Sequence, residues 1–589
     1  MEQRINIAVY IIIFAFGIFL FRLWDLQIIK GNEYKKIDEK NRLRVIDIPA
    51  PRGIIHDRNG KVLVKNVPSF DISVFKEDIP RDPETLKALG RLLGITHDDI
   101  RNRLEKSSVK RFKPVKLKQN VSFKQVAKVE ARKVDFPGLH VEVVGGREYI
   151  YGHSASHVIG YLGRLSLAQL SDPKYSDVPP ESFIGQFGAE KVFDPSLRGA
   201  GGKKILEVDA LGSIIKVVRI QRPVKGEDAD LTIDIDLQVE AEKSLKGKAG
   251  AIVALKPDTG EVLALASAPS FDPNLFVRGI KYKDWKKLVK DPSKPLLNRA
   301  IQSQYPPGST FKIISAIAAL EEGTVTDDTT FECKGSIYFG RVFRCWKAAG
   351  HGSVNLHKAI RESCDVYFYE VAKKLHVDML AQYAFGFGLG RATGIELEGE
   401  VRGLVPTSGW KLDRKNERWY TGETLNTIIG QGYLSATPIQ MARLMAAVVN
   451  GGMLYKPYLL KDGDVNREAE GIVEIRPETT EIIRKALIAV VEEKDGTGKL
   501  AKTDMVRVGG KTGTTQVIGG VVKGDKIPDK YKDHAWFVAF APEKAPQIAV
   551  AVFVEHGGHG SSSAAPIAKR IIEAYYRNLQ KIESVQGEG

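Results

Sequence analysis

The stretch Tyr305-Pro-Pro-Gly-Ser-Thr-Phe-Lys312, followed by the apolar run from Ile313 to Leu320, decides the fold of the region around it. Two prolines and a glycine break regular structure, so the pattern predicts a helix that begins near Ser309. Positions three apart lie on one face of a helix, which places Lys312 beside Ser309. A hydroxyl at the positive end of a helix dipole, with an amine one turn away, is typical of a nucleophilic serine.

The Ser-x-x-Lys spacing is weak evidence by itself because it occurs six times in the chain. Only the copy at Ser309 combines a preceding turn with an apolar helix. The other copies begin at Ser73, Ser107, Ser171, Ser213 and Ser408. For Lys312 to act as a base its amine must be neutral, a state that burial and a neighbouring cation favour. We expect Lys511 to be that cation.

Two further motifs supply the remaining groups that acyl transfer needs. Ser363-Cys-Asp365 offers a second hydroxyl. Lys511-Thr-Gly-Thr514 follows Val506-Arg-Val-Gly-Gly, a pattern that indicates a strand bordering a cleft. A serine nucleophile, a lysine base, a second hydroxyl and a cation on a strand edge together favour acyl transfer through a serine ester.

The strand that carries Lys511 predicts how an acyl donor binds. An extended donor would add to the strand edge by β-augmentation, and Gly513 would remove a side chain where the donor backbone approaches. Lys511 and the hydroxyl of Thr512 or Thr514 suit a terminal carboxylate. The backbone N–H groups of Ser309 and Thr514 are candidates for an oxyanion hole.

Strand patterns at both ends of the C-terminal region, with helices between them, predict an antiparallel sheet covered by helices. The expected strands are residues 230–234, 249–255, 262–268, 537–540 and 548–554, and the expected flanking helices are residues 237–245 and 565–576. Nearer the N-terminus, residues 44–64 indicate a β-hairpin with a turn at Asp57-Arg-Asn-Gly60. Helical patterns at 83–93 and 124–134 indicate a lobe inserted into this region.

A chain of 589 residues is too long for a single core, and 43% hydrophobic with 27% charged residues describes an ordinary folded protein. We therefore predict an α+β multidomain protein. Its expected parts are a cytoplasmic stub (1–4), a transmembrane helix (5–23), a β-rich membrane-proximal pedestal (24–225) with an inserted α/β lobe (about 67–160), a catalytic domain (226–582) and a loose tail (583–589).

The apolar run at residues 5–23 would be ~28 Å long as a helix, which is enough to cross a bilayer core. No small-residue cleavage site follows it, so we expect an uncleaved anchor. More cations follow the run than precede it, against the positive-inside rule, but a long translocated domain can override that bias. The net charge of +15 is spread along the chain, as on a solvated surface, and would also suit anionic lipids or acidic wall polymers. Nothing indicates nucleic-acid binding.

With these motifs in place, the chain resembles the class B penicillin-binding proteins of the elongation type, the penicillin-binding protein 2 family. Motif sets of this kind are also found in class A β-lactamases. Further matching segments are Pro51-Arg-Gly, Asp57-Arg-Asn-Gly60, His157-Val-Ile-Gly-Tyr161, Trp346, Gly350-His-Gly352 and Gly430-Gln-Gly-Tyr-Leu-Ser-Ala-Thr-Pro438. The resemblance covers essentially the whole chain and places it in the inner membrane, with the catalytic domain outside the cytoplasm.

The resemblance implies a D-Ala-D-Ala transpeptidase and carboxypeptidase that cross-links peptidoglycan stem peptides and is inhibited by β-lactams. It implies that Ser309 is acylated, Lys312 is its base, Ser363 carries protons, and Lys511 with Thr514 binds the carboxylate. It also implies a SEDS glycosyltransferase partner, RodA, within an elongation complex, and no organic cofactor. The wider superfamily has asparagine where this chain has Asp365, and an anion there would favour a protonated lysine.

All three cysteines, Cys333, Cys345 and Cys364, lie within a 32-residue stretch that also contains His351. Three thiols and an imidazole form a closed ligand set for structural Zn²⁺. A Cys333–Cys345 disulfide and three unlinked buried cysteines are the alternatives.

Three other functions remain as alternatives. A β-lactam sensor would need several membrane spans, and a β-lactamase would not need the long pedestal. The septal class B enzyme would differ around Trp346 and Gly350-His-Gly352.

Overall fold

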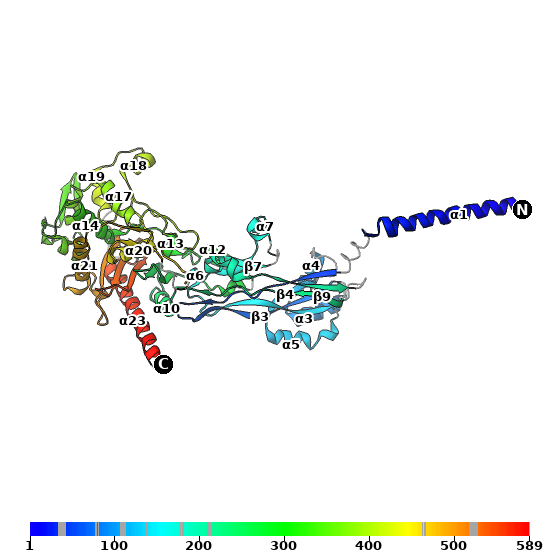
Figure 1. Ribbon diagram of the computed structural model, residues 1–589. Coiled ribbons are helices and arrows are strands. Elements are labelled where there is room, and N and C mark those ends of the chain that lie inside the picture. Colours follow the sequence, from blue (N-terminus) through cyan, green and yellow to red (C-terminus); the bar gives the residue numbers. More distant parts are fainter. Residues whose placement is uncertain are drawn as a thin grey trace. The chain divides into compact units, whose positions relative to one another are not determined.

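The computed structural model describes residues 1–32, 43–76, 79, 82–106, 114–136, 138–176, 178, 182–208, 214–277, 279–461, 463, 467–517 and 528–587 (Figure 1). Ser107 and Ser213, two of the serines in the repeated spacing, lie outside these residues.

The chain packs as two compact units, each assembled from separate stretches. The first contains Met1–Gly53, Asn66–Gly146 and Ser196–Glu227, and the second contains Ile54–Lys65, Arg147–Pro195 and Asp228–Gly589. The last change of unit, after Glu227, lies near the change of domain expected after residue 225. The predicted domain boundaries all stay predictions.

The first unit begins with a long apolar helix, α1 (Glu2–Trp24), none of whose residues is buried. Together with the π-helical turn that follows, it forms a helix from Glu2 to Ile29 that is long and apolar enough to cross a membrane. The predicted apolar helix over residues 5–23 is therefore present.

The first unit also holds a three-stranded antiparallel sheet in the order β1 (Leu43–Ile48), β8 (Gly202–Val208), β9 (Ile214–Gln221). The predicted hairpin is confirmed only in part. The turn at Asp57-Arg-Asn-Gly60 joins β2 (Ile55–His56) to β3 (Val62–Phe75), which pair antiparallel, but the preceding strand β1 pairs with β8 instead. The alternation of apolar and polar residues in β1 does not reveal that its partner strand, β8, lies some 150 residues further along the chain.

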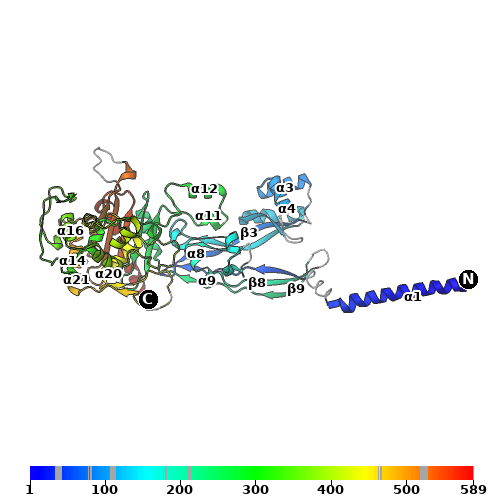
Figure 2. The same ribbon diagram turned by 90° about the horizontal axis from the view of Figure 1, so that it is seen from above.

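The inserted lobe of the first unit packs three helices against strands: α3 (Pro83–Leu93), α4 (His97–Lys106) and α5 (Phe123–Glu130) lie against the later part of β3, β4 (Pro114–Val121) and β5 (Leu139–Tyr149) (Figures 1 and 2). Asp82 caps α3 by accepting from the N–H of Thr85, and Gly94 ends it in the left-handed region, so the predicted helix 83–93 is confirmed. The predicted helix 124–134 ends at Glu130.

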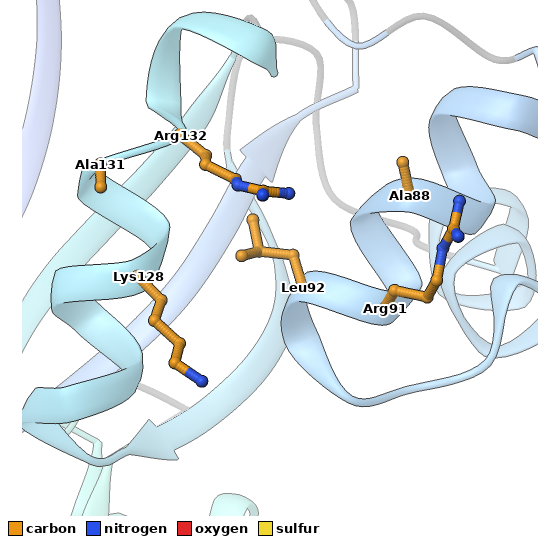
Figure 3. A pocket seen from close by; sticks show the side chains of 6 residues that line it. All are labelled: Ala88, Arg91, Leu92, Lys128, Ala131 and Arg132. Atoms are coloured by element: carbon orange, nitrogen blue, oxygen red, sulfur yellow. The ribbon is translucent and has the colours of Figure 1, made fainter.

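A cavity of about 610 Å³ opens between α3 and α5 of this lobe (Figure 3). Ala88, Arg91 and Leu92 line it from α3, and Lys128, Ala131 and Arg132 line it from α5 and the residues that follow. The three sequence motifs belong to the second unit, so none of them lines this cavity.

The core of the second unit is a five-stranded antiparallel sheet. Its order is β12 (Val262–Ala268), β11 (Gly250–Leu255), β21 (Ile548–Val554), β20 (His534–Ala541) and β19 (Gly509–Thr515), so β19 is an edge strand. The strand pairs predicted at 249–268 and 537–554 are confirmed. They join in the centre of one sheet, because β11 pairs with β21.

Every residue of β11, β12 and β21 is buried, which requires cover on both faces of the sheet. Helices α10 (Ile235–Ser244) and α23 (Ala565–Gly587) pack together on one face, and α20 (Pro438–Val449) packs on the sheet as well. Asp234 caps α10, so the strand expected over 230–234 is shortened to β10 (Ala229–Asp230). Since α23 continues to Gly587, residues 583–587 are helical rather than a loose tail.

Candidate active site

Ser309 lies in a short 3-10 turn, Gly308–Phe311, that leads directly into α14 (Lys312–Glu321). The prediction that a helix begins near this serine is confirmed. Lys312 is fully buried at the first position of α14, whereas Ser309 is only half-buried. The hydroxyl is therefore reachable at the surface while the amine beside it along the chain lies in the interior.

The amine of Lys312 joins the first and second motifs. Its Nζ donates to the backbone oxygen of Ser363 at 2.9 Å and to Ser363 Oγ at 3.3 Å. It also forms an ion pair with Asp365, with Nζ 2.7 Å from Oδ1. The fold therefore brings together three side chains that the sequence predicted for the site, Lys312, Ser363 and Asp365. An anion does lie beside the lysine, as the sequence indicated.

Asp365 is the first residue of α16 (Asp365–Ala372), where the helix dipole favours a negative charge. Its second oxygen, Oδ2, accepts from the backbone N–H of Trp346 at 3.0 Å. The preceding Ser363 has a φ of +55°, in the left-handed region that only a well-determined surrounding structure holds for a side chain of this kind. That turn directs Ser363 toward Lys312.

The third motif occupies the edge strand β19, as predicted. Lys511 is fully buried, and its Nζ donates to the backbone oxygen of Thr512 at 3.2 Å. Burial, and secondarily the charge of Lys312, hold the pKa of Lys511 well below its ordinary value, while the charge of Asp365 opposes the shift. The three motifs therefore share one electrostatic environment.

The residues after Lys511 differ in accessibility. Thr512 is buried and its Oγ1 lies 2.9 Å from Oγ1 of Thr497, whereas Thr514 is half-buried and its Oγ1 accepts from the N–H of Gly560 at 3.3 Å. Gly513 is needed for a reason that the sequence did not indicate. A Cβ there would lie 2.8 Å from the carbonyl oxygen of Pro307. The glycine therefore makes room for residues 305–309, which lead into α14 and are called the nucleophile turn below.

The nucleophile turn and β19 are in backbone contact. A Cβ on Gly308, whose φ is +59°, would lie 2.7 Å from the oxygen of Thr514 and 3.2 Å from its nitrogen. On the other side, a Cβ on Gly430 would lie 1.9 Å from the oxygen of Gly308. The backbone that leads into Ser309 therefore lies against Thr514, the pair named as candidates for the oxyanion hole.

The cysteines and the histidine form one buried cluster. Their ligand atoms, the three Sγ atoms and a ring nitrogen, all lie within 4.8 Å of one another. Nδ1 of His351 is 3.5 Å from Sγ of Cys333 and 3.6 Å from Sγ of Cys345. All three thiols are free, so the alternative Cys333–Cys345 disulfide is not formed.

The donor set of this cluster fits a tetrahedral metal ion. Zinc–sulfur and zinc–nitrogen bonds at a tetrahedral angle separate the two ligand atoms by about 3.6 Å, close to both Nδ1–Sγ distances. A hydrogen bond from Cys364 lowers the pKa of the Cys345 thiol, as a thiolate ligand requires. The backbone N–H of Asp365 donates to Cys345 Sγ at 3.4 Å, so the cluster touches the second motif directly.

Two neighbours of the motifs were not predicted as parts of the site. The hydroxyl of Thr497 contacts that of Thr512, and Thr497 lies in a loop with no local signal of function. Gln431 belongs to the segment Gly430–Pro438 that carries the family resemblance, but nothing in it indicates that its Nε2 donates to the backbone oxygen of Thr514 at 3.2 Å. A nucleophile turn, a lysine–serine–aspartate cluster and an edge strand that carries a buried lysine together define a serine acyltransferase of the penicillin-recognising class.

Comparisons with known proteins agree with this class. A family model described as the penicillin-binding protein transpeptidase domain matches residues 250–573, and one described as the penicillin-binding protein dimerisation domain matches residues 47–231. The chain is 36% identical to the peptidoglycan D,D-transpeptidase MrdA of Acinetobacter baumannii, over 98% of this chain and 88% of that protein.

Two solved structures are similar over most of the chain. A complex between penicillin-binding protein 2 and MreC from Helicobacter pylori has a TM-score of 0.81 at 30% identity and covers 91% of this chain and 99% of the other. A peptidoglycan synthase complex that coordinates polymerization and crosslinking has a TM-score of 0.73 at 34% identity, with 97% and 98% covered. The chain belongs to the penicillin-binding protein 2 family of serine D,D-transpeptidases.

This result confirms the predicted family, the α+β fold and the enzyme class. The sensor and septal alternatives are not favoured, because relatives named as MrdA match nearly the whole chain. Like other members of this family, the enzyme uses peptidoglycan as substrate and binds β-lactams.

Proposed function

We propose that this D,D-transpeptidase cross-links peptidoglycan stem peptides during cell elongation through an acyl-enzyme on Ser309. One observation carries the assignment of residues: Lys312, on the helix that Ser309 opens, contacts both Ser363 and Asp365, while the turn before Ser309 lies against the Lys511 strand. These groups are the ones that acylation of a serine needs.

In the first step Ser309 Oγ bonds to the carbonyl carbon of the donor's penultimate D-alanine, and the amide bond to the terminal D-alanine breaks. Lys312 takes the proton of Ser309, and the proton passes through Ser363 Oγ to the leaving amine. Asp365 stabilises the positive charge that Lys312 then carries. The N–H groups of Ser309 and Thr514 bind the oxyanion.

The donor's carboxylate binds the hydroxyls of Thr512 and Thr514, in front of the buried amine of Lys511. Because an anion favours a protonated amine, its arrival raises the depressed pKa of Lys511 and converts that amine into a cation. Binding of the correct donor and formation of the positive site are therefore coupled.

In the second step an amine of a neighbouring stem peptide attacks the ester carbonyl, the bond to Ser309 Oγ breaks, and the serine regains its proton. Water in place of the amine gives the carboxypeptidase reaction. A β-lactam acylates Ser309 in the same way, but its leaving nitrogen stays attached to the acyl group, so the acyl-enzyme persists.

The test is the intact mass of the protein after incubation with a β-lactam. Wild-type protein should gain one drug mass, mapped to the peptide that contains Ser309, and Ser309→Ala should gain none. Ser171→Ala, which alters an exposed serine in the same Ser-x-x-Lys spacing, is the matched control and should label fully. Labelled Ser309→Ala protein would overturn the assignment.

We further propose that α1 anchors the protein in the inner membrane with the catalytic part outside the cytoplasm, and that residues 24–225 act as a pedestal for residues 226–582. The apolar helix and the extracytoplasmic substrate support this topology. The partners we propose are a RodA-type glycosyltransferase, consistent with the similarity to a synthase that couples polymerization to crosslinking, and an MreC-like protein.

Because no segment of the chain resembles a glycosyltransferase, the purified protein without its membrane helix should not polymerise lipid-linked precursor by itself. It should cross-link glycan only when strands made by a partner are supplied. Glycan strands formed by this protein alone, seen on a polyacrylamide gel, would exclude the division of labour.

Finally, we propose that Cys333, Cys345, His351 and Cys364 hold one structural zinc ion. Four protein ligands leave no open position, so the ion would supply rigidity rather than chemistry at the acyl centre. The N–H···S contact from Asp365 supports a link between the cluster and the second motif.

A further inference from the structure

A polar network around the buried Arg299 lies beside the nucleophile turn and has no role in the reaction described above. Arg299, on α13 (Arg299–Gln302), donates from Nε to Oε1 of Glu555 at 3.0 Å, and only 3% of its side chain is exposed. Its other nitrogens donate to the backbone oxygens of Ser293 and Lys294. The same Oε1 of Glu555 accepts a hydrogen bond from the hydroxyl of Tyr305.

The network is arranged to keep the Glu555 carboxylate ionised and the Tyr305 hydroxyl a donor. Burial alone would raise the pKa of Glu555, but the hydrogen bond from Tyr305 and the charge of Arg299 lower it overall. Burial and the Glu555 charge raise the pKa of Tyr305, so its hydroxyl keeps its proton. His534, which packs edge-on against the Tyr305 ring at 5.3 Å, is neutral at pH 7, because burial lowers its pKa to about 4.

Tyr305 is the first residue of the turn that ends at Ser309, and the turn is fixed at each step. The ring of Tyr305 stacks on Phe553 of β21 at 4.0 Å, and its backbone exchanges two hydrogen bonds with Ala436. At the other end, the N–H of Gly308 donates to the oxygen of Gly430 at 2.9 Å.

Between these ends the turn is tied to the substrate-binding strand. The carbonyl oxygen of Pro306 accepts from Thr515 Oγ1 at 2.6 Å and from Trp536 Nε1 at 3.1 Å. Two consecutive prolines fix φ at residues 306 and 307, which limits how far the backbone between Tyr305 and Ser309 can absorb a shift of Tyr305. The Tyr305 hydroxyl, only four residues from the nucleophile, is the side-chain link from this turn to the carboxylate that follows the central strand β21.

We infer that Arg299, Glu555 and Tyr305 form a positioning network that sets the place of Ser309 Oγ relative to the oxyanion N–H groups. The inference rests on the proposed acylation of Ser309 and adds residues that never touch substrate. Through the hydrogen bond to Glu555 and the stacking on Phe553, the sheet core restrains the turn that carries Ser309. Small errors in the placement of a reacting atom lower reaction rates strongly, so the network acts on the rate of acylation rather than on donor binding.

The test compares Tyr305→Phe with Tyr383→Phe. Tyr305→Phe removes only the hydroxyl and keeps the ring that stacks on Phe553. Tyr383 on α17 (Val377–Gly386) also donates its hydroxyl to a glutamate, Glu322, at 2.8 Å, but outside the nucleophile turn. Stopped-flow acylation by a fluorescent penicillin gives the binding constant and the acylation rate constant separately. For Tyr305→Phe we expect the rate constant to fall about tenfold or more, with little change in binding.

Tyr383→Phe should lose about as much thermal stability as Tyr305→Phe does, but it should acylate at the wild-type rate. Glu555→Gln keeps an oxygen that can accept from Tyr305 and should retain most of the rate, whereas Arg299→Lys, which loosens the carboxylate, should lose several-fold. If Tyr305→Phe fails to fold, these two variants decide the question. Acylation at Ser309 with the wild-type rate constant in Tyr305→Phe, or in Arg299→Lys, would overturn the inference. Wild-type protein labelled elsewhere would instead overturn the proposed nucleophile.

Discussion

At the scale of single residues, Asp365 connects two parts of the site. Its carboxylate lies 2.7 Å from Lys312 Nζ. The same carboxylate also accepts from the backbone of Trp346, whose side chain is 60% exposed and donates from Nε1 to the oxygen of Glu362. Asp365 therefore fixes a surface aromatic residue and a buried amine together.

Replacing Asp365 by Asn should lower the acylation rate constant. Asn keeps an oxygen for the N–H of Trp346 but loses the ion pair, 2.7 Å from Oδ1 to Nζ, that holds the Lys312 amine beside Ser363. Stopped-flow acylation by a fluorescent penicillin measures this rate constant. Glu370→Gln, which removes the partner of Lys373 on the same helix, is the control and should acylate at the wild-type rate. An unchanged rate constant in Asp365→Asn would show that this ion pair does not position the lysine for the reaction.

A second prediction at this scale concerns stability. His157 is buried and donates from Nε2 to the backbone oxygen of Pro295 at 2.9 Å, and burial lowers its pKa from 6.5 to about 4. Because the unfolded chain then binds more protons than the folded one, the stabilisation is complete above pH 6.5 and is lost as the pH falls toward 4. The slope should reach about 1.4 kcal/mol per pH unit for this group.

Denaturant unfolding of His157→Gln, measured from pH 7 to pH 4, should show a shallower loss of stability than the wild type. His559→Gln, at an exposed histidine, serves as the control. Parallel curves for wild type and His157→Gln would mean that another group carries the acid sensitivity.

At the scale of elements, the cysteine cluster connects the segment between α14 and α16 to the second motif. Cys333 ends strand β13 (Phe331–Cys333), His351 precedes β16 (Gly352–Val354), and these two strands pair. Cys364 directly precedes the first residue of α16 and follows Ser363. The cluster therefore joins two strands and the start of a helix.

Carefully purified protein should contain about one zinc per chain, and acid should release the metal as the thiolates take up protons. Cys345→Ser should lower both thermal stability and the acylation rate without altering the nucleophile. Cys364→Ser discriminates best, because it removes a ligand without touching the alternative disulfide. Retention of full metal content by Cys364→Ser, measured by plasma mass spectrometry, would exclude this ligand set.

The helices and strands also show which structural features the local sequence predicts and which it does not. Helix 83–93 was predicted to the residue because Asp82, Pro83 and Gly94 are strong end signals. The core strand pairs were predicted because both strands of each pair are apolar and adjacent in sequence. By contrast, the pairing of β1 with β8 and the packing role of Gly513 depend on partners far along the chain, which no local pattern reveals. The contact of Thr497 with Thr512 spans 15 residues but joins a loop to a strand, and neither carries a pattern that predicts it.

At the scale of the whole molecule, the apolar helix at the N-terminus should control where the enzyme is found but not how it reacts. Removal of residues 1–32 should release the protein from membranes into the soluble fraction, while the acylation constants with a β-lactam stay unchanged. A high-salt wash serves as the control for the net charge of +15, which can also hold the protein on anionic lipid. Truncated protein that resists this wash would place a second anchor in the remaining chain.

The interleaved composition of the two units has a consequence for biosynthesis. The second unit starts with Ile54–Lys65 but needs strands that end at Val554, roughly 500 residues later. At ribosomal speeds of about 5 to 20 residues per second, its first segments wait on the order of 25 to 100 s for their partners. In the proposed topology, a partly exported chain would expose apolar segments beside a membrane during that time. The nascent protein should therefore depend on chaperones outside the cytoplasm, and truncation at residue 225 should yield an N-terminal fragment that is degraded rather than a stable pedestal.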